Sequence, residues 1–177
     1  MKRVMIIGPG GSGKSTLARK LGEITGLPVH HLDAYHWQPG WVPTPEDEWD
    51  EFQKRLVEEG EWIIDGNYGR TLDIRMAKAD TIIFFDLPRY ISIYRALKRR
   101  IQYHGKTRPD LNEDCPERLS LEFIKWIWNY GKEKRSAILN KLESYAKTKN
   151  VITLRTLKDV DSLIEHVKKN NTLDGIS

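Results

Sequence analysis

The sequence contains one cysteine, Cys115, among its 177 residues. A single cysteine excludes an intramolecular disulfide and a cluster of cysteine ligands around a metal, and it is typical of a reducing compartment. Long apolar runs are also missing. The first run, Val4–Ile7, is too short for the core of a signal peptide, and no stretch approaches the roughly 20 apolar residues of a membrane span. We therefore expect a cytoplasmic protein with no membrane partner.

A large excess of one charge is missing as well, because 29 Lys and Arg residues against 25 Asp and Glu residues give a net charge of only +4. This mild positive balance permits an anionic ligand but does not require nucleic acid. The chain is 39% hydrophobic and 31% charged, which is typical of a globular protein. The length fits one domain with its own core, so we expect residues 1–177 to form a single domain, as a monomer or a homodimer.

Short apolar runs alternate with helical patterns along the chain. The five β-like runs are Arg3–Gly8, Pro28–Asp33, Trp62–Gly66, Thr81–Leu87 and Asn150–Arg155. Several are continuously apolar, as strands covered on both faces should be. We expect helices at about residues 15–25, 45–60, 89–103, 117–130 and 160–169. This alternation predicts an α/β fold built on a parallel sheet with helices on both faces.

The stretch Gly8–Thr16, GPGGSGKST, matches the pattern G-x-x-x-x-G-K-[ST] between an apolar run and an amphipathic helix. In that context backbone N–H groups and the helix N-terminus converge on phosphate oxygens. We expect Lys14 to reach the β- and γ-phosphates and the Ser15 hydroxyl to bind Mg²⁺, so the predicted cofactors are ATP and Mg²⁺. The predicted cofactor-binding residues of this loop are Gly8, Gly10, Gly11, Ser12, Gly13, Lys14, Ser15 and Thr16.

Acidic residues follow three of the predicted strands: Asp33, Asp65 and Asp86. Ligands of open α/β sheets bind beyond the carboxyl ends of the strands, so these side chains are candidates for a nucleotide site. Phosphoryl transfer needs one carboxylate to hold Mg²⁺, and a hydroxyl acceptor benefits from a second carboxylate as a base. We predict these roles for Asp65 and Asp33, respectively, and a structural role in a turn for Asp86.

Two longer segments resemble adenylate kinases. WIIDGNYGRTLDIR resembles their segment Asp-Gly-x-x-x-Arg-Thr with apolar residues before it, and FDLPRYISIYRALKR resembles the segment that follows. The whole chain is similar to a small bacterial group of adenylate-kinase-like proteins named topology modulation protein, which shares HLDAYHW and WIIDGNY. The resemblance implies a three-layer P-loop NTPase fold. Its five-stranded parallel sheet, in the order 2-3-1-4-5, would be flanked by helices and carry a short helical lid at residues 104–118.

The resemblance also implies roles for single residues. Arg70 would hold the transferring or accepting phosphate, Arg95 would lie near the nucleotide base, and Arg99 near the phosphates. Arg108 and Arg118 would reach over the nucleotide from the lid. Between Leu87 and Pro109 the chain has seven Lys or Arg residues and no acid, which suits a polyphosphate. The predicted catalytic residues are Lys14, Asp33, Asp65, Arg70 and Arg99, and the predicted metal site is Ser15 with Asp65.

The segment after the second predicted strand departs from the family pattern. Nucleoside monophosphate kinases carry an arginine three positions after the Asp, whereas this chain has His36. Histidine is a weaker, pH-dependent phosphate contact. The acceptor therefore either lacks a phosphate group or has a phosphate group that the protein binds in a different way. Residues 34–60 are predicted as a helical insertion that binds the acceptor, where Trp37 and Trp41 either stack on a planar group or form a small core. The predicted substrate-binding residues are Asp33, His36, Trp37 and Arg70.

The sequence leaves three functions open. An ATP-dependent phosphotransferase acting on a nucleotide, nucleoside or similar small metabolite is favoured by the two carboxylates and the arginines. A nucleotide-binding, DNA-associated regulatory protein is the alternative, although no helix-turn-helix is visible, so nucleic acid is a less favoured partner. A GTPase-like switch ranks last because no Asn-Lys-x-Asp segment is present. We also expect no structural metal, an inert Cys115, and core positions for Trp126, Trp128 and Tyr130.

Overall fold

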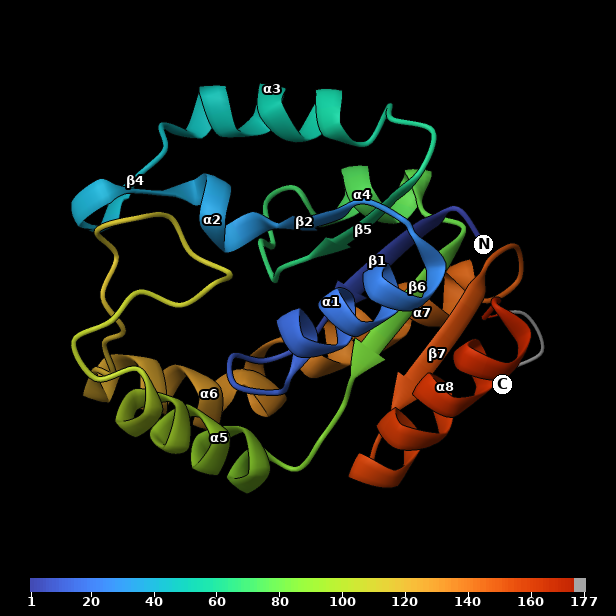
Figure 1. Cartoon of the computed structure of the whole chain (residues 1–177). Coiled ribbons are helices and arrows are strands. Elements are labelled where there is room, and N and C mark those ends of the chain that lie inside the picture. Colours follow the sequence, from blue (N-terminus) through green and yellow to red (C-terminus); the bar gives the residue numbers. More distant parts are fainter. Residues whose placement is uncertain (174–177) are drawn as a thin grey trace.

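A parallel five-stranded sheet forms the centre of the computed structural model, which describes residues 1–173 (Figure 1). Its strands in spatial order are β2 (Val29–His31), β5 (Trp62–Asp65), β1 (Arg3–Ile7), β6 (Thr81–Phe85) and β7 (Asn150–Leu154). These are the five apolar runs of the sequence. A separate hairpin is formed by β3 (Trp37–Gln38) and β4 (Val42–Pro43). When the five strands of the main sheet are numbered along the chain without this hairpin, their order is 2-3-1-4-5, which confirms the prediction. In the register Ile6 pairs with Asp65 and Ile83, so the carboxyl ends of the central strands lie at one edge.

Helices cover both faces of the sheet, which confirms the three-layer α/β fold. The helices are α1 (Lys14–Thr25), α2 (Leu32–His36), α3 (Glu46–Leu56), α4 (Leu72–Lys78), α5 (Arg89–Gln102), α6 (Leu121–Glu133), α7 (Arg135–Tyr145) and α8 (Leu157–Asn170). α1 and α8 pack on one face, while α3, α4, α6 and α7 contribute to the core on the other. Within residues 1–173 no helix is both long enough and apolar enough to cross a membrane.

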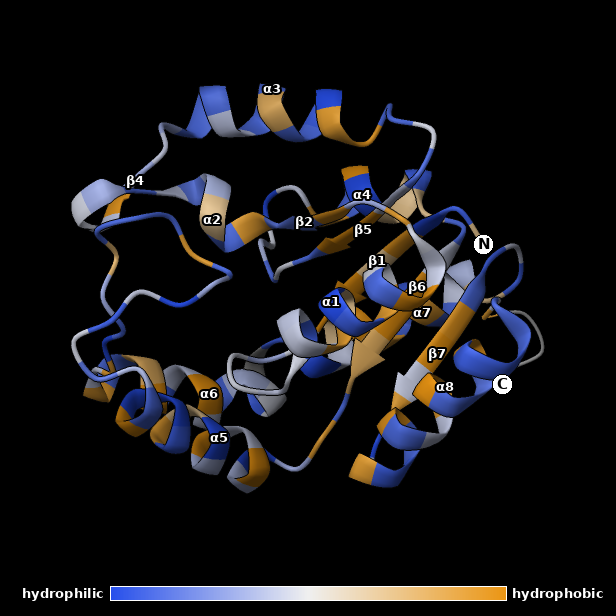
Figure 2. Cartoon of the chain, viewed as in Figure 1, coloured by the Kyte–Doolittle hydropathy of each residue, from blue (hydrophilic) through white to orange (hydrophobic). Residues whose placement is uncertain are grey.

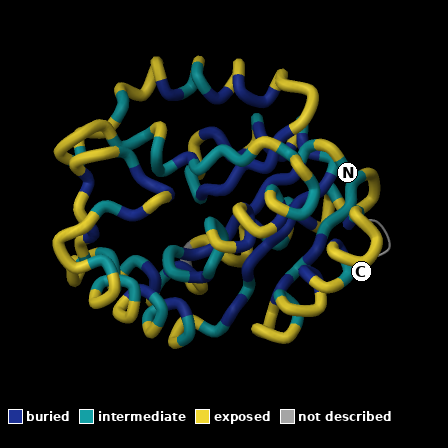
Figure 3. The backbone as a smooth tube through the Cα atoms, in the orientation of Figure 1, coloured by how far each residue is buried: buried dark blue, intermediate teal, exposed yellow. Residues whose placement is uncertain are grey.

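Neighbouring residues of the central strand β1 face opposite layers. Val4 and Ile6 pack toward α1 and α8, and Met5 and Ile7 pack toward the layer of α4 and α7. All four side chains are fully buried, which explains why the strand is continuously apolar. Figure 2 shows these hydrophobic strands between helices with hydrophilic outer faces. Figure 3 shows that the central strands β5, β1 and β6 are the most deeply buried, whereas the edge strand β2 is only partly buried. The packed sheet therefore fixes the positions of the residues at the carboxyl ends of its strands.

The insertion at residues 34–60 contains more structure than the sequence indicates. Asp33 lies in the first turn of α2, which begins directly after β2. A hairpin of β3 (Trp37–Gln38) and β4 (Val42–Pro43) then encloses the 3-10 turn Pro39–Trp41, and α3 follows. Helices α4 and α7 were not predicted, because each buries only two apolar residues spaced four apart: Leu72 and Met76 in α4, Ile138 and Leu142 in α7.

The lid segment, residues 104–118, is a loop and not the short helical lid that was predicted. A bridge between Thr107 and Pro116 joins its two arms. Gly105 and Asp114 have φ angles of 69° and 57°, and the prolines remove backbone donors, so helical geometry cannot continue here. The next helix, α6, begins only at Leu121, where the Ser120 hydroxyl caps it by accepting from Phe123 N at 3.1 Å.

Candidate active site

A cavity of about 1090 Å³ lies at the carboxyl end of the sheet, large enough for a nucleotide and a second small molecule. The predicted site residues on its wall are Gly10, Gly11, Gly13, Lys14, Ser15, Thr16, Asp33, Trp37, Asp65, Arg95, Arg99, Arg108 and Arg118. Two further predicted residues of the phosphate loop, Gly8 and Ser12, are buried in the protein interior. A Cβ atom on Gly8 would lie 2.7 Å from Phe85 Cβ. Gly8 and Ser12 shape the loop without facing the cavity.

The phosphate loop turns tightly at positions that leave no room for a side chain. Gly11 has a φ of 76°, and a Cβ atom there would lie 2.3 Å from the Ser92 carbonyl oxygen. The Lys14 ammonium group donates to the Pro9 carbonyl oxygen at 2.9 Å, across the turn. Burial lowers the pKa of Lys14, and the charges of Asp65 and Asp33 oppose this shift. The lysine is therefore held at the loop with both carboxylates close enough to affect its charge.

Ser15 and Asp65 form a pair of oxygen donors beside this loop. Ser15 Oγ donates to Asp65 Oδ2 at 2.7 Å, and the Asp65 carboxylate is almost fully buried at the end of β5. A hydroxyl and a carboxylate are ligands that Mg²⁺ accepts. Within residues 1–173 no group of three or more His, Cys, Asp or Glu residues could hold a metal ion. The pair therefore fits a Mg²⁺ ion that takes its remaining ligands from phosphate oxygens and water.

His31 belongs to the same corner, although the sequence analysis did not select it. It pairs with Asp65 in the β2–β5 register, and its Nδ1 lies 2.5 Å from Asp65 Oδ1. Burial lowers the pKa of His31, but the hydrogen bond and charge of Asp65 together outweigh burial, so the pKa lies above its ordinary value. The sequence feature that could have indicated His31 as a site residue is its position at the end of a predicted strand, two residues before Asp33.

Asp33 is paired with a tyrosine from the loop after β5. The Tyr68 hydroxyl donates to Asp33 Oδ1 at 2.7 Å, and both residues line the cavity. Burial raises the pKa of Tyr68, and the charge of Asp33 raises it further, so the hydroxyl stays a donor at neutral pH. The fully buried Arg75 guanidinium fixes this loop by donating to the carbonyl oxygens of Gly66 and Tyr68, at 2.9 and 2.7 Å.

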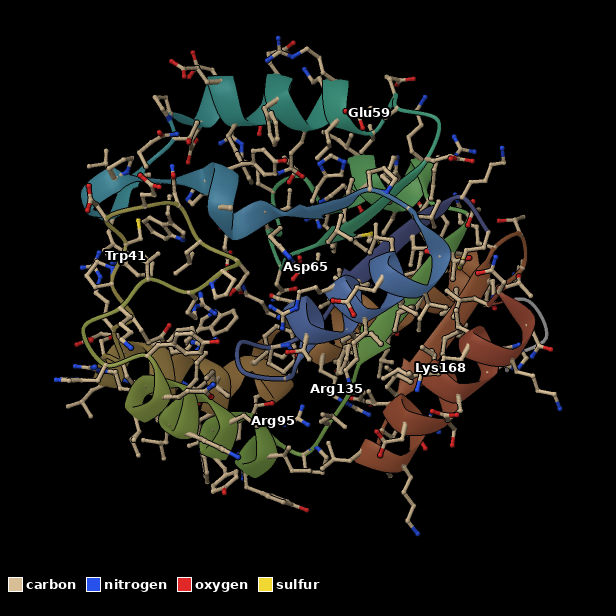
Figure 4. The ribbon with its side chains drawn as sticks, in the orientation of Figure 1. Trp41, Glu59, Asp65, Arg95, Arg135 and Lys168 are labelled. Carbon is tan, nitrogen blue, oxygen red and sulfur yellow. The ribbon has the colours of Figure 1, made fainter. Side chains whose placement is uncertain are left out.

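Four predicted arginines line the cavity, Arg95 and Arg99 from α5 and Arg108 and Arg118 from the lid. Arg95 Nη1 donates to the Ser12 carbonyl oxygen at 2.7 Å, which ties α5 to the phosphate loop (Figure 4). Arg99 Nε donates to Glu117 Oε1 at 2.9 Å, and Arg108 Nε lies 2.8 Å from Glu117 Oε2 in an ion pair without hydrogen-bond geometry. Burial lowers the pKa of Arg99, and the charge of Arg108 lowers it further. Glu117 thus holds two guanidinium groups together on the cavity wall.

The lid loop contacts the insertion at Trp41, which Figure 4 shows at their junction. Trp41 Nε1 donates to the Pro116 carbonyl oxygen at 3.2 Å, and the Arg118 guanidinium lies 4.3 Å from the centre of the Trp41 ring system. Cys115 is a buried free thiol whose Sγ lies 3.3 Å from the Gln38 carbonyl oxygen. These contacts close one side of the cavity.

Arg70 and His36 require a correction, because the structure brings neither to the cavity wall. Arg70 is about half exposed and pairs with Glu46 and Asp50, since the acidic first turn of α3 attracts its guanidinium. The imidazole of His36 packs against three aromatic rings, those of Trp37, Trp49 and Tyr68. Burial lowers the pKa of His36, so its neutral form is favoured there.

Aromatic residues of α6 form part of the cavity wall, and one of them, Trp126, was predicted to lie in the core. The core position predicted for Tyr130 is confirmed, because its side chain is buried in the main hydrophobic cluster. The rings of Phe123 and Trp126 are stacked with centroids 5.8 Å apart, and both line the cavity. A Cβ atom on Gly10 would lie 2.5 Å from Phe123, so the ring packs directly on the phosphate loop. Trp128 is 46% exposed, with the Arg89 guanidinium 3.7 Å from its ring centre. Helical spacing alone cannot separate a core face from a ligand-binding wall.

No protein-family model matches the chain, and no curated protein matches it. Solved structures match over its full length. The shikimate kinase of Acinetobacter baumannii in complex with shikimate has a TM-score of 0.59 at 12% identity, over 100% of this chain and 96% of that chain. The shikimate kinase of Bacteroides thetaiotaomicron has a TM-score of 0.55 at 16% identity, over 95% and 96%.

These similarities show that the chain shares the α/β fold of the two shikimate kinases, in agreement with its parallel five-stranded sheet. At such low identities they establish the fold alone. The narrower resemblance to the topology modulation group is not confirmed by them.

Proposed function

We propose that the chain is an ATP-dependent phosphotransferase that moves the γ-phosphoryl group to a nucleotide, a nucleoside or a similar small metabolite. One observation carries this proposal. The Ser15–Asp65 pair, Lys14 and a second carboxylate, Asp33, line one cavity at the end of the sheet. A nucleotide switch needs the first three groups but has no use for a second carboxylate beside them.

Within this proposal the chain binds and orients the nucleotide with groups that are already in place. Loop N–H groups and Lys14 hold the phosphates, and Ser15 with Asp65 hold Mg²⁺, which neutralises charge on the phosphate oxygens when bound. Arg95, Arg99 and Arg108 add positive charge from α5 and the lid, and Arg118 adds its charge from the lid near Trp41. The lid loop excludes water, which would otherwise compete with the acceptor.

The same proposal places the reaction in the cytoplasm, where ATP is abundant and Cys115 stays reduced. One copy of the chain supplies the cavity wall, so a monomer would suffice. The DNA-associated alternative ranks lower, because basic residues of α5 can bind the nucleotide phosphates instead of DNA: Arg95, Lys98 and Arg99 all line the cavity.

A coupled assay of ADP release tests the proposal. Purified protein with Mg²⁺ and ATP is mixed in turn with nucleosides, nucleoside monophosphates and common metabolites. We expect at least one compound to raise ADP release well above the rate without acceptor. If every compound leaves the rate unchanged, the phosphotransferase proposal is wrong.

A further inference from the structure

The acceptor end of the cavity is built around the Asp33 carboxylate. Its Oδ1 accepts the Tyr68 hydrogen bond, while its Oδ2 has no hydrogen-bond partner among residues 1–173. Asn67 and Trp37 line the cavity with it, and so does Trp41, whose ring centre lies 5.4 Å from that of Trp37. Asp33 Oδ1 is thus fixed in place by a hydrogen bond, and Asp33 Oδ2 is available to bind a ligand.

Two side chains that could bind an acceptor phosphate are directed elsewhere. Arg70 is held in ion pairs with Glu46 and Asp50 on α3. His36 is enclosed by aromatic rings, and its Nδ1 is buried without a hydrogen-bond partner. Arg118, near Trp41, comes from the lid and stacks on the indole ring. Apart from Arg70, the elements that carry Asp33 and Tyr68, namely β2, α2 and the loop after β5, contain no Lys or Arg residue, and His31 on β2 is paired with Asp65. The cations on the cavity wall come from other elements: Lys14 from the phosphate loop, Arg99 from α5 and Arg108 from the lid.

The two possible kinds of acceptor group place opposite demands on such a site. An alcohol must lose its proton as it attacks phosphorus, and a carboxylate within reach can accept that proton. A phosphate acceptor is already ionised, so it needs no base, and a carboxylate beside it repels it. A site for a phosphate acceptor needs guanidinium groups in place of a carboxylate.

We infer that the acceptor group is an alcohol on a ring-bearing molecule, so that the product is a phosphate monoester and not a diphosphate. This inference rests on the proposed phosphotransferase function. The alcohol oxygen forms a bond to the γ-phosphorus, and the bond from that phosphorus to the β,γ-bridging oxygen breaks, which releases ADP. The alcohol proton passes to Asp33 Oδ2 and then to solvent. The faces of Trp37 and Trp41 would pack against the ring of the acceptor.

The test uses acceptors in matched pairs, each with and without a phosphate: adenosine and AMP, uridine and UMP, glucose and glucose 6-phosphate. ADP release is measured with each, and the product is identified by ³¹P NMR. We expect the unphosphorylated member of a pair to be the better acceptor and the new resonance to be that of a monoester. A diphosphate product from a nucleoside monophosphate would overturn the inference and leave the phosphotransferase proposal standing. Failure of every pair would overturn both.

Matched variants test the role of Asp33 itself. Asp33→Asn should lower kcat by about 10²–10⁴-fold with little change in the KM for ATP. Asp47→Asn, an exposed acid of α3, serves as control and should keep the wild-type kcat. Tyr68→Phe retains the ring that packs on His36 and Trp49 but removes the donor to Asp33, and it should lower kcat severalfold in a protein of unchanged thermal stability. Wild-type kcat in Asp33→Asn would contradict a base at this position.

Discussion

Ser15 Oγ donates a hydrogen bond of 2.7 Å to Asp65 Oδ2, which links the start of α1 to the end of β5. The two residues are 50 positions apart in the sequence and meet because β1, which leads into the phosphate loop, lies beside β5 in the sheet. The sheet therefore sets the geometry of the proposed magnesium site. The phosphate loop supplies one ligand and a neighbouring strand supplies the other.

Asp65→Asn tests this pair. The amide keeps the size of the side chain but removes the negative charge that would hold Mg²⁺ and its waters. We expect the Mg²⁺ concentration for half-maximal activity to rise by about 10–100-fold. A Mg²⁺ titration of ADP release measures this, with Asp47→Asn as control. An unchanged Mg²⁺ requirement in Asp65→Asn would show that the metal binds elsewhere.

Glu117→Ala tests the carboxylate between Arg99 and Arg108. Its side chain is 1% exposed, so removing it leaves the partly buried Arg99 without its carboxylate partner and leaves Arg108 with Asp110 alone, at 3.2 Å. We expect a loss of about 3–5 kcal/mol in the free energy of unfolding, measured by urea denaturation, together with weaker ATP binding. Glu113→Ala, an exposed acid of the lid, should change neither quantity. Equal stabilities of the two variants would contradict the role of Glu117.

Arg70→Ala tests the correction to the sequence-based prediction. Arg70 lies off the cavity wall in exposed ion pairs, which solvent screens so that they contribute little to stability. We expect the acceptor KM and kcat to stay within about twofold of wild type, as measured by steady-state kinetics. A large rise in the acceptor KM would show that Arg70 leaves Glu46 and Asp50 to bind the acceptor, and would weaken the inference of an alcohol.

His31 should make stability depend on pH. Its folded-state pKa lies above the ordinary value of about 6.5 because the hydrogen bond and charge of Asp65 outweigh burial. The stabilisation is therefore fully present below pH 6.5 and is lost as the pH rises through the folded-state pKa. Urea unfolding in EDTA at several pH values should show a steeper decline for wild type than for His31→Gln. Parallel curves for the two proteins would contradict this account.

The phosphate loop, the strand order and Asp65 could be predicted from the sequence, because each depends on local patterns that a parallel sheet brings to one edge. Glu117, Tyr68 and His31 could not, since their roles depend on contacts with residues distant in the sequence. Trp126 shows the limit of periodicity, because residues on a cavity wall and residues on a core face have the same helical spacing. Arg70 was predicted to bind a phosphate, but its guanidinium instead forms ion pairs with Glu46 and Asp50 of α3. No sequence motif predicts these ion pairs.

The most direct test of the central claim compares two lysine variants in the assay of ADP release. Lys14→Ala removes the ammonium group at the phosphate loop, whereas Lys168→Ala removes an exposed lysine of α8 that pairs with Glu165. Phosphoryl transfer at this loop predicts that Lys14→Ala lowers acceptor-dependent kcat by at least about 100-fold while Lys168→Ala keeps the wild-type rate. Wild-type turnover in Lys14→Ala would contradict the proposed function.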